Sequence, residues 1–153
     1  MANNCGFTIR ISGPNKDEAT KLFKSLHRVF GIYIEKGKAY NQISGDLAWS
    51  FSYVKDCNPE KFDLIFKDNL FEVYTEEPGC GFAEHYIFFN GECIKEECVD
   101  YYEFSYECDY EDFIEFSPVK LTEEQYNKHF ETEDTLIIGG YNEYKWKDYS
   151  DFN

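Results

Sequence analysis

The chain has 153 residues, the length of one ordinary domain, and 42% of them are apolar, which suffices for a substantial buried core. This composition, with aromatic residues at 20%, excludes a disordered chain. Thirty acidic residues against 15 basic ones leave a formal net charge of −15, which disfavours binding to nucleic acid or to an anionic membrane. A basic protein is the kind of partner that this charge favours.

The N-terminal residues lead directly into a strand pattern, with neither the basic region nor the apolar segment of a signal peptide. No apolar run approaches the ~20 residues that cross a bilayer. In such a chain the six cysteines are expected to be reduced thiols. We therefore expect a cytoplasmic protein.

Residues 7–12 alternate between apolar and polar side chains and predict a half-buried strand. Asn15 and Glu18 then form the pattern of a capping box at the start of a helix. Apolar residues at helical spacing predict that this helix has about four turns and stops at Gly31. Its apolar face comprises Ala19, Leu22, Phe23, Leu26, Val29 and Phe30.

Residues 32–46 predict a short strand and a turn. Residues 47–54 alternate more clearly and predict a strand with Trp49, Phe51 and Tyr53 on one face. The Asn-Pro pair at residues 58–59 predicts the start of a second helix, because proline is favoured at the first helical position. The buried face of that helix comprises Phe62, Ile65 and Phe66.

Residues 70–75 predict a third strand, and residues 77–80 predict a type II turn with Gly79 at the position that needs a positive φ. The Asn-Gly pair at residues 90–91 lies between two apolar stretches and predicts a β-hairpin. Residues 102–110 alternate strictly, which predicts a strand with one packed aromatic face and one acidic face.

Thr122 and Gln125 form the pattern of a capping box, and Leu121 with Tyr126 forms that of a hydrophobic staple, for a short third helix. Residues 136–138 predict a strand that two glycines end, and the chain beyond is expected to form an added strand or a tail. The element order β-α-β-α-β-β-β-α-β is typical of an α+β fold, a mostly antiparallel sheet with helices packed on one side.

Residues 72–87, EVYTEEPGCGFAEHYI, are the longest of several segments that resemble one family. The shorter segments are residues 1–5, 11–14, 48–50, 90–92 and 97–101. Together they resemble the ferredoxin-like domain family of small phage and plasmid proteins, the YubB type. That family often carries a tryptophan before the early cysteine, where this chain has Asn4.

The resemblance implies a ferredoxin-like domain over residues 1–110. Residues 111–153, which it does not cover, are expected to form a C-terminal helix and strand extension packed on the same domain. It also implies carriage on a mobile element and a place in the cytosol of a bacterial host. The function of the family is largely unassigned, so the resemblance supplies no catalytic residues.

Residues 92–115 hold ten acidic residues and one basic residue, Lys95. On a strand, alternate residues lie ~6.6–7 Å apart, close to the ~7 Å between alternate phosphates of a nucleic-acid strand. Such a row would mimic a phosphate backbone and bind the basic channel of a nucleic-acid-binding protein. The predicted partner-binding residues are Asp100, Glu103, Glu107, Asp109, Glu111, Asp112 and Glu115. The alternative is a solvated acidic face that has no partner.

The leading hypothesis is a non-catalytic accessory protein of a phage or other mobile element. It would inhibit a nucleic-acid-binding host defence complex, of the kind that CRISPR or restriction systems form, through an acidic, DNA-mimicking surface. Direct contact with nucleic acid or a membrane is not expected, and a homodimer is left open. A structural protein without a target is an alternative.

A second hypothesis, from a different class, is a small enzyme or ligand-binding domain with a pocket near Glu84 and His85. Neighbouring strand residues point to opposite faces, so these two side chains are not expected to act together. We therefore predict no catalytic residues.

Cys80, His85, Cys93 and Cys98 offer the ligand types of a zinc site. The spacing between them lacks the close C-x₂-C pair that brings zinc ligands together. Buried thiols packed as small apolar side chains are the expected state, with no metal and no cofactor.

Overall fold

Seven strands, five α-helices and a short 3₁₀-helix form within residues 4–152, the part of the chain that this computed structural model describes. The first three residues of the family-like segment at 1–5 lie outside the described residues. The elements are β1 (Asn4–Ser12), α1 (Lys16–Phe23), β2 (Val29–Glu35), β3 (Asn41–Ala48), α2 (Phe51–Cys57), α3 (Pro59–Phe66), β4 (Leu70–Glu77), β5 (Phe82–Phe89), β6 (Glu92–Ser105), α4 (Tyr110–Phe116), α5 (Glu123–Phe130), β7 (Thr135–Gly139) and η1 (Tyr149–Phe152).

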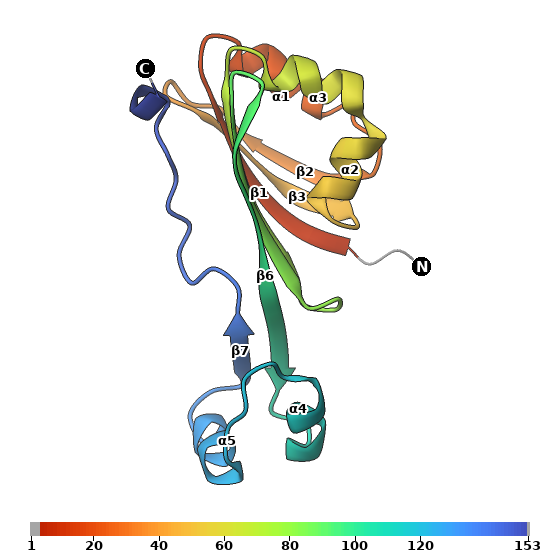
Figure 1. Ribbon diagram of the computed structural model, residues 1–153, viewed down its shortest axis with the longest axis vertical. Coiled ribbons are helices and arrows are strands. Elements are labelled where there is room, and N and C mark those ends of the chain that lie inside the picture. The colour runs from red at the N-terminus through yellow and green to blue at the C-terminus, as the bar shows by residue number, and fades with distance from the viewer. Residues whose placement is uncertain (1–3, 153) are drawn as a thin grey trace.

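The strands form a single antiparallel sheet in the order β2-β3-β1-β4-β5-β6-β7. Helices α1, α2 and α3 pack on one face of this sheet (Figure 1). Between helices and sheet lies the main core, where the fully buried rings are those of Phe23, Phe51, Phe62 and Phe71. The predicted α+β class with an antiparallel sheet is confirmed.

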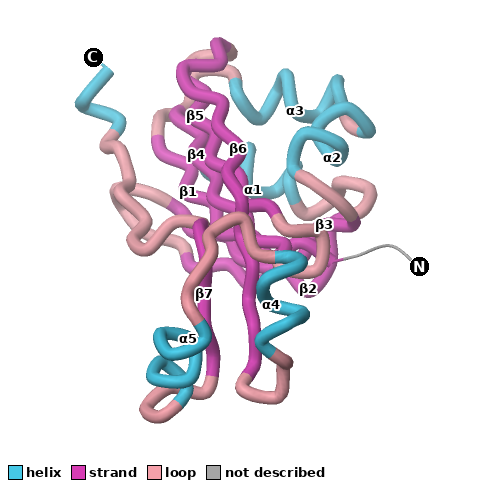
Figure 2. The backbone as a smooth tube through the Cα atoms, turned by 60° about the horizontal axis from the view of Figure 1, so that its bottom comes forward, coloured by secondary structure: helices cyan, strands magenta, loops and turns pink. Residues whose placement is uncertain are grey.

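Strand β6 is 14 residues long and joins two parts of the molecule. Residues 92–100 pair with β5, whereas residues 101–105 pair with β7. Around this second pairing, α4 and α5 pack on a separate small core formed by Phe104, Phe113, Tyr126 and Leu136. We call residues 101–139 the distal lobe, and it projects from one end of the sheet (Figure 1, Figure 2).

Beyond β7 the chain returns along the sheet face that carries no helices (Figure 1). The turn uses Gly139 and Gly140, with φ of 81° and 73°. A Cβ atom on Gly139 would lie 2.0 Å from the carbonyl oxygen of Asp100, so only glycine fits there. The chain from residue 140 to residue 152, which we call the tail, forms no strand and ends in η1.

The first helix is shorter than predicted. α1 ends at Phe23, and Val29 and Phe30 lie in β2 instead of on the helix. Arg28 has a φ of 68°, a left-handed conformation that separates the helix from the strand. Asn15 precedes the helix, but its side chain makes no capping hydrogen bond.

The predicted strand over residues 47–54 is wrong in its second half, where α2 forms. β3 ends before Trp49, whose φ of 89° turns the chain. Ser50 then caps the helix by accepting a backbone N–H hydrogen bond. The buried carboxylate of Glu84 accepts the N–H of Phe51 at 2.8 Å, so the start of α2 is fixed from the sheet.

Most other elements lie where the sequence predicts them, including the β5–β6 hairpin and α5 with both capping-box hydrogen bonds. The turn before β5 differs from the prediction. Its positive φ of 78° lies at Gly81, not at Gly79, so it is not the predicted type II turn. The N–H of Gly81 donates to the Glu77 carbonyl at 2.9 Å, one residue further than a β-turn reaches.

Candidate functional site

The distal lobe holds most of the net charge of the chain. Eleven acidic residues against two basic ones give residues 101–139 a formal net charge of −9, out of −15 for the whole chain. The acidic residues are Glu103, Glu107, Asp109, Glu111, Asp112, Glu115, Glu123, Glu124, Glu131, Glu133 and Asp134.

All eleven of these side chains are exposed to solvent. Within residues 4–152, acids and bases lie at ion-pair distance in two places, Lys16 with Asp17 and His85 with Glu72, and both lie outside the lobe. The negative charge of the lobe is therefore not neutralised by described residues. An uncompensated field of this kind attracts a basic surface and speeds its approach.

The prediction that these carboxylates form a row along one strand is wrong. β6 ends at Ser105, where its pairing with β7 ends, and Tyr106, predicted on the packed face, is 63% exposed. Tyr110, Phe113 and Ile114 have helical spacing and pack on the core of the lobe, so α4 forms there instead.

The seven predicted partner-binding residues are thus distributed over several elements. Asp100 and Glu103 lie on β6, Glu107 lies in the following turn, Asp109 is the N-cap residue of α4, and Glu111, Asp112 and Glu115 lie on α4. All seven are exposed. Six of them lie in the distal lobe and Asp100 directly precedes it, so they do not form a straight row.

Large apolar side chains lie exposed among these acids. Phe116 is 59% exposed, Ile137 51% and Val119 50%, in addition to Tyr106. Exposed aromatic and aliphatic groups within a charged rim are the composition of a protein-binding surface.

A second polar cluster lies beneath the tail, and we call it the sheet-face cluster. It comprises Glu72, Tyr74, Glu76, His85 and Glu97. Nε2 of His85 lies 2.6 Å from Oε2 of Glu72, and both side chains are buried. The ring of Tyr74 stacks on the His85 ring at 4.0 Å. The cluster therefore joins β4 and β5 across the hairpin.

The tail covers this cluster with donors directed at its carboxylates. The hydroxyl of Tyr144 donates to Glu76 and that of Tyr141 to Glu97, each at 2.7 Å. The backbone N–H of residue 147 donates to Glu72, also at 2.7 Å. Burial, followed by these hydrogen bonds to carboxylates, raises the pKa of both tyrosines above the ordinary value.

Glu84 and His85 lie on opposite faces of the sheet, as expected for neighbours on a strand. Glu84 lies on the helix side, where its carboxylate accepts hydrogen bonds from α2 and from the hydroxyl of Thr75 at 2.9 Å. A cavity of about 620 Å³ lies beside His85 between the sheet and the tail, and Glu84 does not line it. The structure thus brings His85 together with Glu72, and not with Glu84.

The cysteines are mostly at the surface. Cys5 is buried, whereas Cys80, Cys93 and Cys98 are exposed, which corrects the expectation that these three thiols are buried. Among residues 4–152, no three His, Cys, Asp or Glu side chains are placed to hold a metal ion. In the same part of the chain, no helix has the length and apolar character to span a membrane.

The contacts of Glu72 and of the aromatic residues in the tail were not predicted from the sequence. A signal was present, because Glu72, Tyr74 and Glu76 are alternate residues of one predicted strand and so share a face with each other. Comparison with models of known protein families, with curated proteins and with solved structures finds no match to this chain.

Proposed function

We propose that this chain is a non-catalytic binding protein whose distal lobe docks on a basic, nucleic-acid-binding protein and competes there with the nucleic acid. The observation that carries the proposal is the set of eleven exposed carboxylates that no base in the described chain neutralises. Arginine and lysine side chains of a nucleic-acid channel are the groups that such carboxylates bind.

The proposed mimicry of a phosphate backbone depends on carboxylates that lie close together on α4. Glu111 and Glu115 are four residues apart on α4, which places their Cβ atoms about 5–6 Å apart. That separation is comparable to the ~7 Å rise along the helix axis over two phosphates of one strand. The exposed apolar groups of the lobe would add contact area that DNA lacks, so the complex need not rest on charge alone.

We also propose that β1–β4 with α1–α3 form a ferredoxin-like core. The supporting observations are the element order β-α-β-β-α-β, with α2 and α3 in the second helical position, and the antiparallel strand order β2-β3-β1-β4. Together with the family resemblance, this supports a protein of a phage or plasmid whose target is a defence complex in the bacterial cytosol.

The test compares two triple variants that change the net charge equally. The lobe variant carries Glu107→Lys, Glu111→Lys and Glu115→Lys. The control variant carries Glu35→Lys, Asp56→Lys and Asp63→Lys, which are exposed residues outside the lobe that make no side-chain hydrogen bond or ion pair with described residues. Each variant changes the formal charge from −15 to −9.

Tagged wild-type protein and both variants are used to capture partners from a bacterial extract at low and at high salt, and captured proteins are identified by mass spectrometry. We expect the wild type and the control to retain the same basic protein at low salt, and the lobe variant to lose it. The purified partner should then bind a DNA or RNA duplex less tightly when the wild-type chain is added. Equal retention by the lobe variant and the wild type would refute the proposal.

A further inference from the structure

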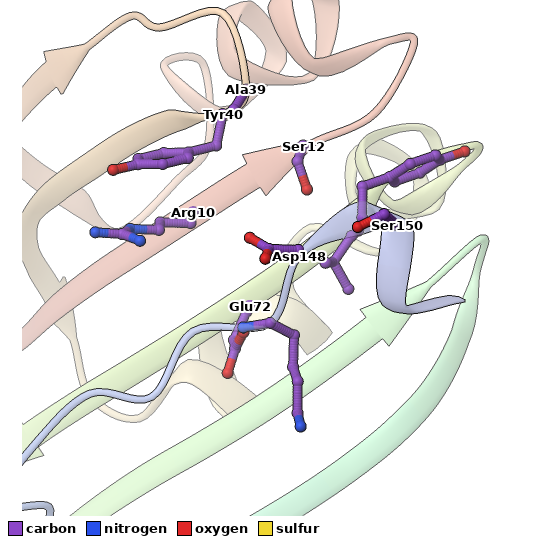
Figure 3. Close-up of a pocket in the computed structure, with 10 residues that line it drawn as sticks. Arg10, Ser12, Ala39, Tyr40, Glu72, Asp148 and Ser150 are labelled. Carbon is purple, nitrogen blue, oxygen red and sulfur yellow. The ribbon is translucent and has the colours of Figure 1, made fainter. Parts of the chain in front are cut away.

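A cavity of about 360 Å³ lies between the sheet and the C-terminal tail (Figure 3). Its walls come from β1, β4, the loop between β2 and β3, and residues 147–150 of the tail. This volume is in the range of sites for small molecules. The tail supplies a large part of the wall, so the cavity is complete only while the tail lies on the sheet.

One end of the cavity is basic. Figure 3 shows Arg10 beside Tyr40 at this end, and the Arg10 guanidinium lies 4.1 Å from the centre of the Tyr40 ring and 4.7 Å from that of Trp146. Its Nε–H donates to the side chain of Gln42 at 2.9 Å. The terminal Nη groups make no hydrogen bond to a described residue, so an ordered guanidinium retains donors for a carboxylate.

The other end carries acceptors. Asp148 and Ser150 of the tail lie there with Ser12 of β1 (Figure 3). Within residues 4–152, the side chains of these three residues make no hydrogen bond or ion pair. A carboxylate with two hydroxyl groups is a suitable site for an ammonium group, which has three donors and no acceptor.

The formal charges of the lining residues cancel. Arg10 and Lys147 are basic, whereas Glu72 and Asp148 are acidic. A phosphate or a dicarboxylate would lie against two carboxylates, and a simple cation would lie against the guanidinium. A molecule with one carboxylate and one ammonium group suits both ends.

We propose that this cavity binds a small zwitterion of the α-amino-acid class, with its carboxylate toward Arg10 and its ammonium group toward Asp148. The ligand would touch the sheet and the tail at once, and so it would stabilise the tail on the sheet. This site is separate from the distal lobe and does not depend on the function proposed for the lobe.

Trp146 contacts the guanidinium of Arg10 and so reports on the cavity. The chain has two tryptophans, so a Trp49→Phe variant leaves Trp146 as the single tryptophan, which is excited at wavelengths that tyrosine does not absorb. Into this variant we would titrate L-alanine, L-leucine and L-glutamine as zwitterions, and acetate, methylammonium and phosphate as ions of one sign. We expect a saturable change in fluorescence with at least one amino acid and none with the ions.

Site variants in the Trp49→Phe background locate the binding. Asp148→Asn should weaken the affinity about tenfold or more, because a charge-assisted hydrogen bond is lost. Glu143→Gln removes the same charge from a tail residue that does not line the cavity, and it should leave the affinity unchanged. The bound amino acid should also slow tryptic cleavage at Lys145, which reads the position of the tail without fluorescence.

Binding of an amino acid that Asp148→Asn weakens and Glu143→Gln does not would support the proposal. No saturable change with any of the three amino acids would overturn it. Binding of phosphate or acetate at equal strength would also overturn it, because the site would then select an anion and not a zwitterion.

Discussion

The hydroxyl groups of Tyr141 and Tyr144 are predicted to hold the tail on the sheet. Tyr144→Phe removes the hydroxyl that donates to Glu76 at 2.7 Å and keeps the ring that stacks on Tyr74 at 4.3 Å. Tyr141→Phe does the same for the hydrogen bond to Glu97. Each change therefore tests one hydrogen bond while the packing of the tail is retained.

The expected magnitude follows from the acceptors. A hydrogen bond to a charged group contributes about 1.5–3 kcal/mol. Glu76 and Glu97 are only half-buried, so water replaces part of the lost bond, and we expect the lower end of that range. About 1.5 kcal/mol corresponds to a roughly tenfold larger fraction of molecules with a detached tail.

The assay is limited trypsin cleavage, because Lys145 and Lys147 lie within the tail and neither variant alters them. When opening and closing are fast, the cleavage rate follows the population of the open form. Tyr149→Phe is the matched control, since its hydroxyl makes no hydrogen bond to a described residue and its ring packs on Phe89. If the control and Tyr144→Phe are cleaved at the same rate, the hydroxyl contacts do not hold the tail.

Three further predictions concern the buried groups. Burial raises the pKa of Cys5 from 9.0 to about 12, so this thiol should not react with a disulfide reagent at pH 8 before unfolding, whereas the exposed Cys57 should react at once. Because the pKa of Cys5 is higher in the folded than in the unfolded chain, the stability that this thiol contributes is complete below pH 9 and is lost between pH 9 and 12. The Tm of Cys5→Ala should therefore fall less than that of the wild type as the pH rises through this range. Glu84→Gln should cost about 2–3 kcal/mol of unfolding free energy in denaturant titrations, because an NH2 group replaces one of two carboxylate oxygens, and both oxygens now accept hydrogen bonds, Oε1 from Phe51 N–H and Oε2 from the Tyr86 hydroxyl. An unchanged midpoint would contradict this. Phe113→Ala should cost about 3–5 kcal/mol in the lobe, and hydrogen exchange should then rise in α4 and α5 but not in α1; a uniform rise would show that the two cores unfold together.

Local signals in the sequence were sufficient for several elements. The Asn-Gly turn at residues 90–91 and the capping box of Thr122 and Gln125 each act within four residues, and both form as predicted. These patterns satisfy backbone groups next to themselves, so tertiary packing has little to alter. The α+β class followed from the order of such elements.

Short alternating stretches were insufficient to distinguish a strand from a helix, because the spacing of their apolar residues fits both structures. Phe51 and Val54 lie three residues apart and are buried on α2, although residues 47–54 also alternate. The same ambiguity affects residues 102–110, where the strand continues only as far as β7 pairs with it. Which structure forms depends on partners distant in the sequence, such as Glu84 beneath α2.

The candidate site was predictable in composition but not in arrangement. The excess of acids predicts an exposed negative surface, and every predicted carboxylate is exposed. Their gathering on one lobe depends on β6 passing beyond β5 to pair with β7. The Glu72–His85 contact likewise depends on the register that places Tyr74 opposite His85.

The separate core of the lobe has a physical consequence for the proposed function. Eleven carboxylates on a small unit repel one another, and such repulsion destabilises a compact state. The lobe offsets this with its own aromatic core around Phe113 and with the continuous strand β6, which anchors it to the main sheet. A basic partner would relieve the repulsion, so binding and folding of the lobe favour each other. Salt would then act in opposite directions: it would stabilise the free lobe by screening repulsion and weaken the complex by screening attraction.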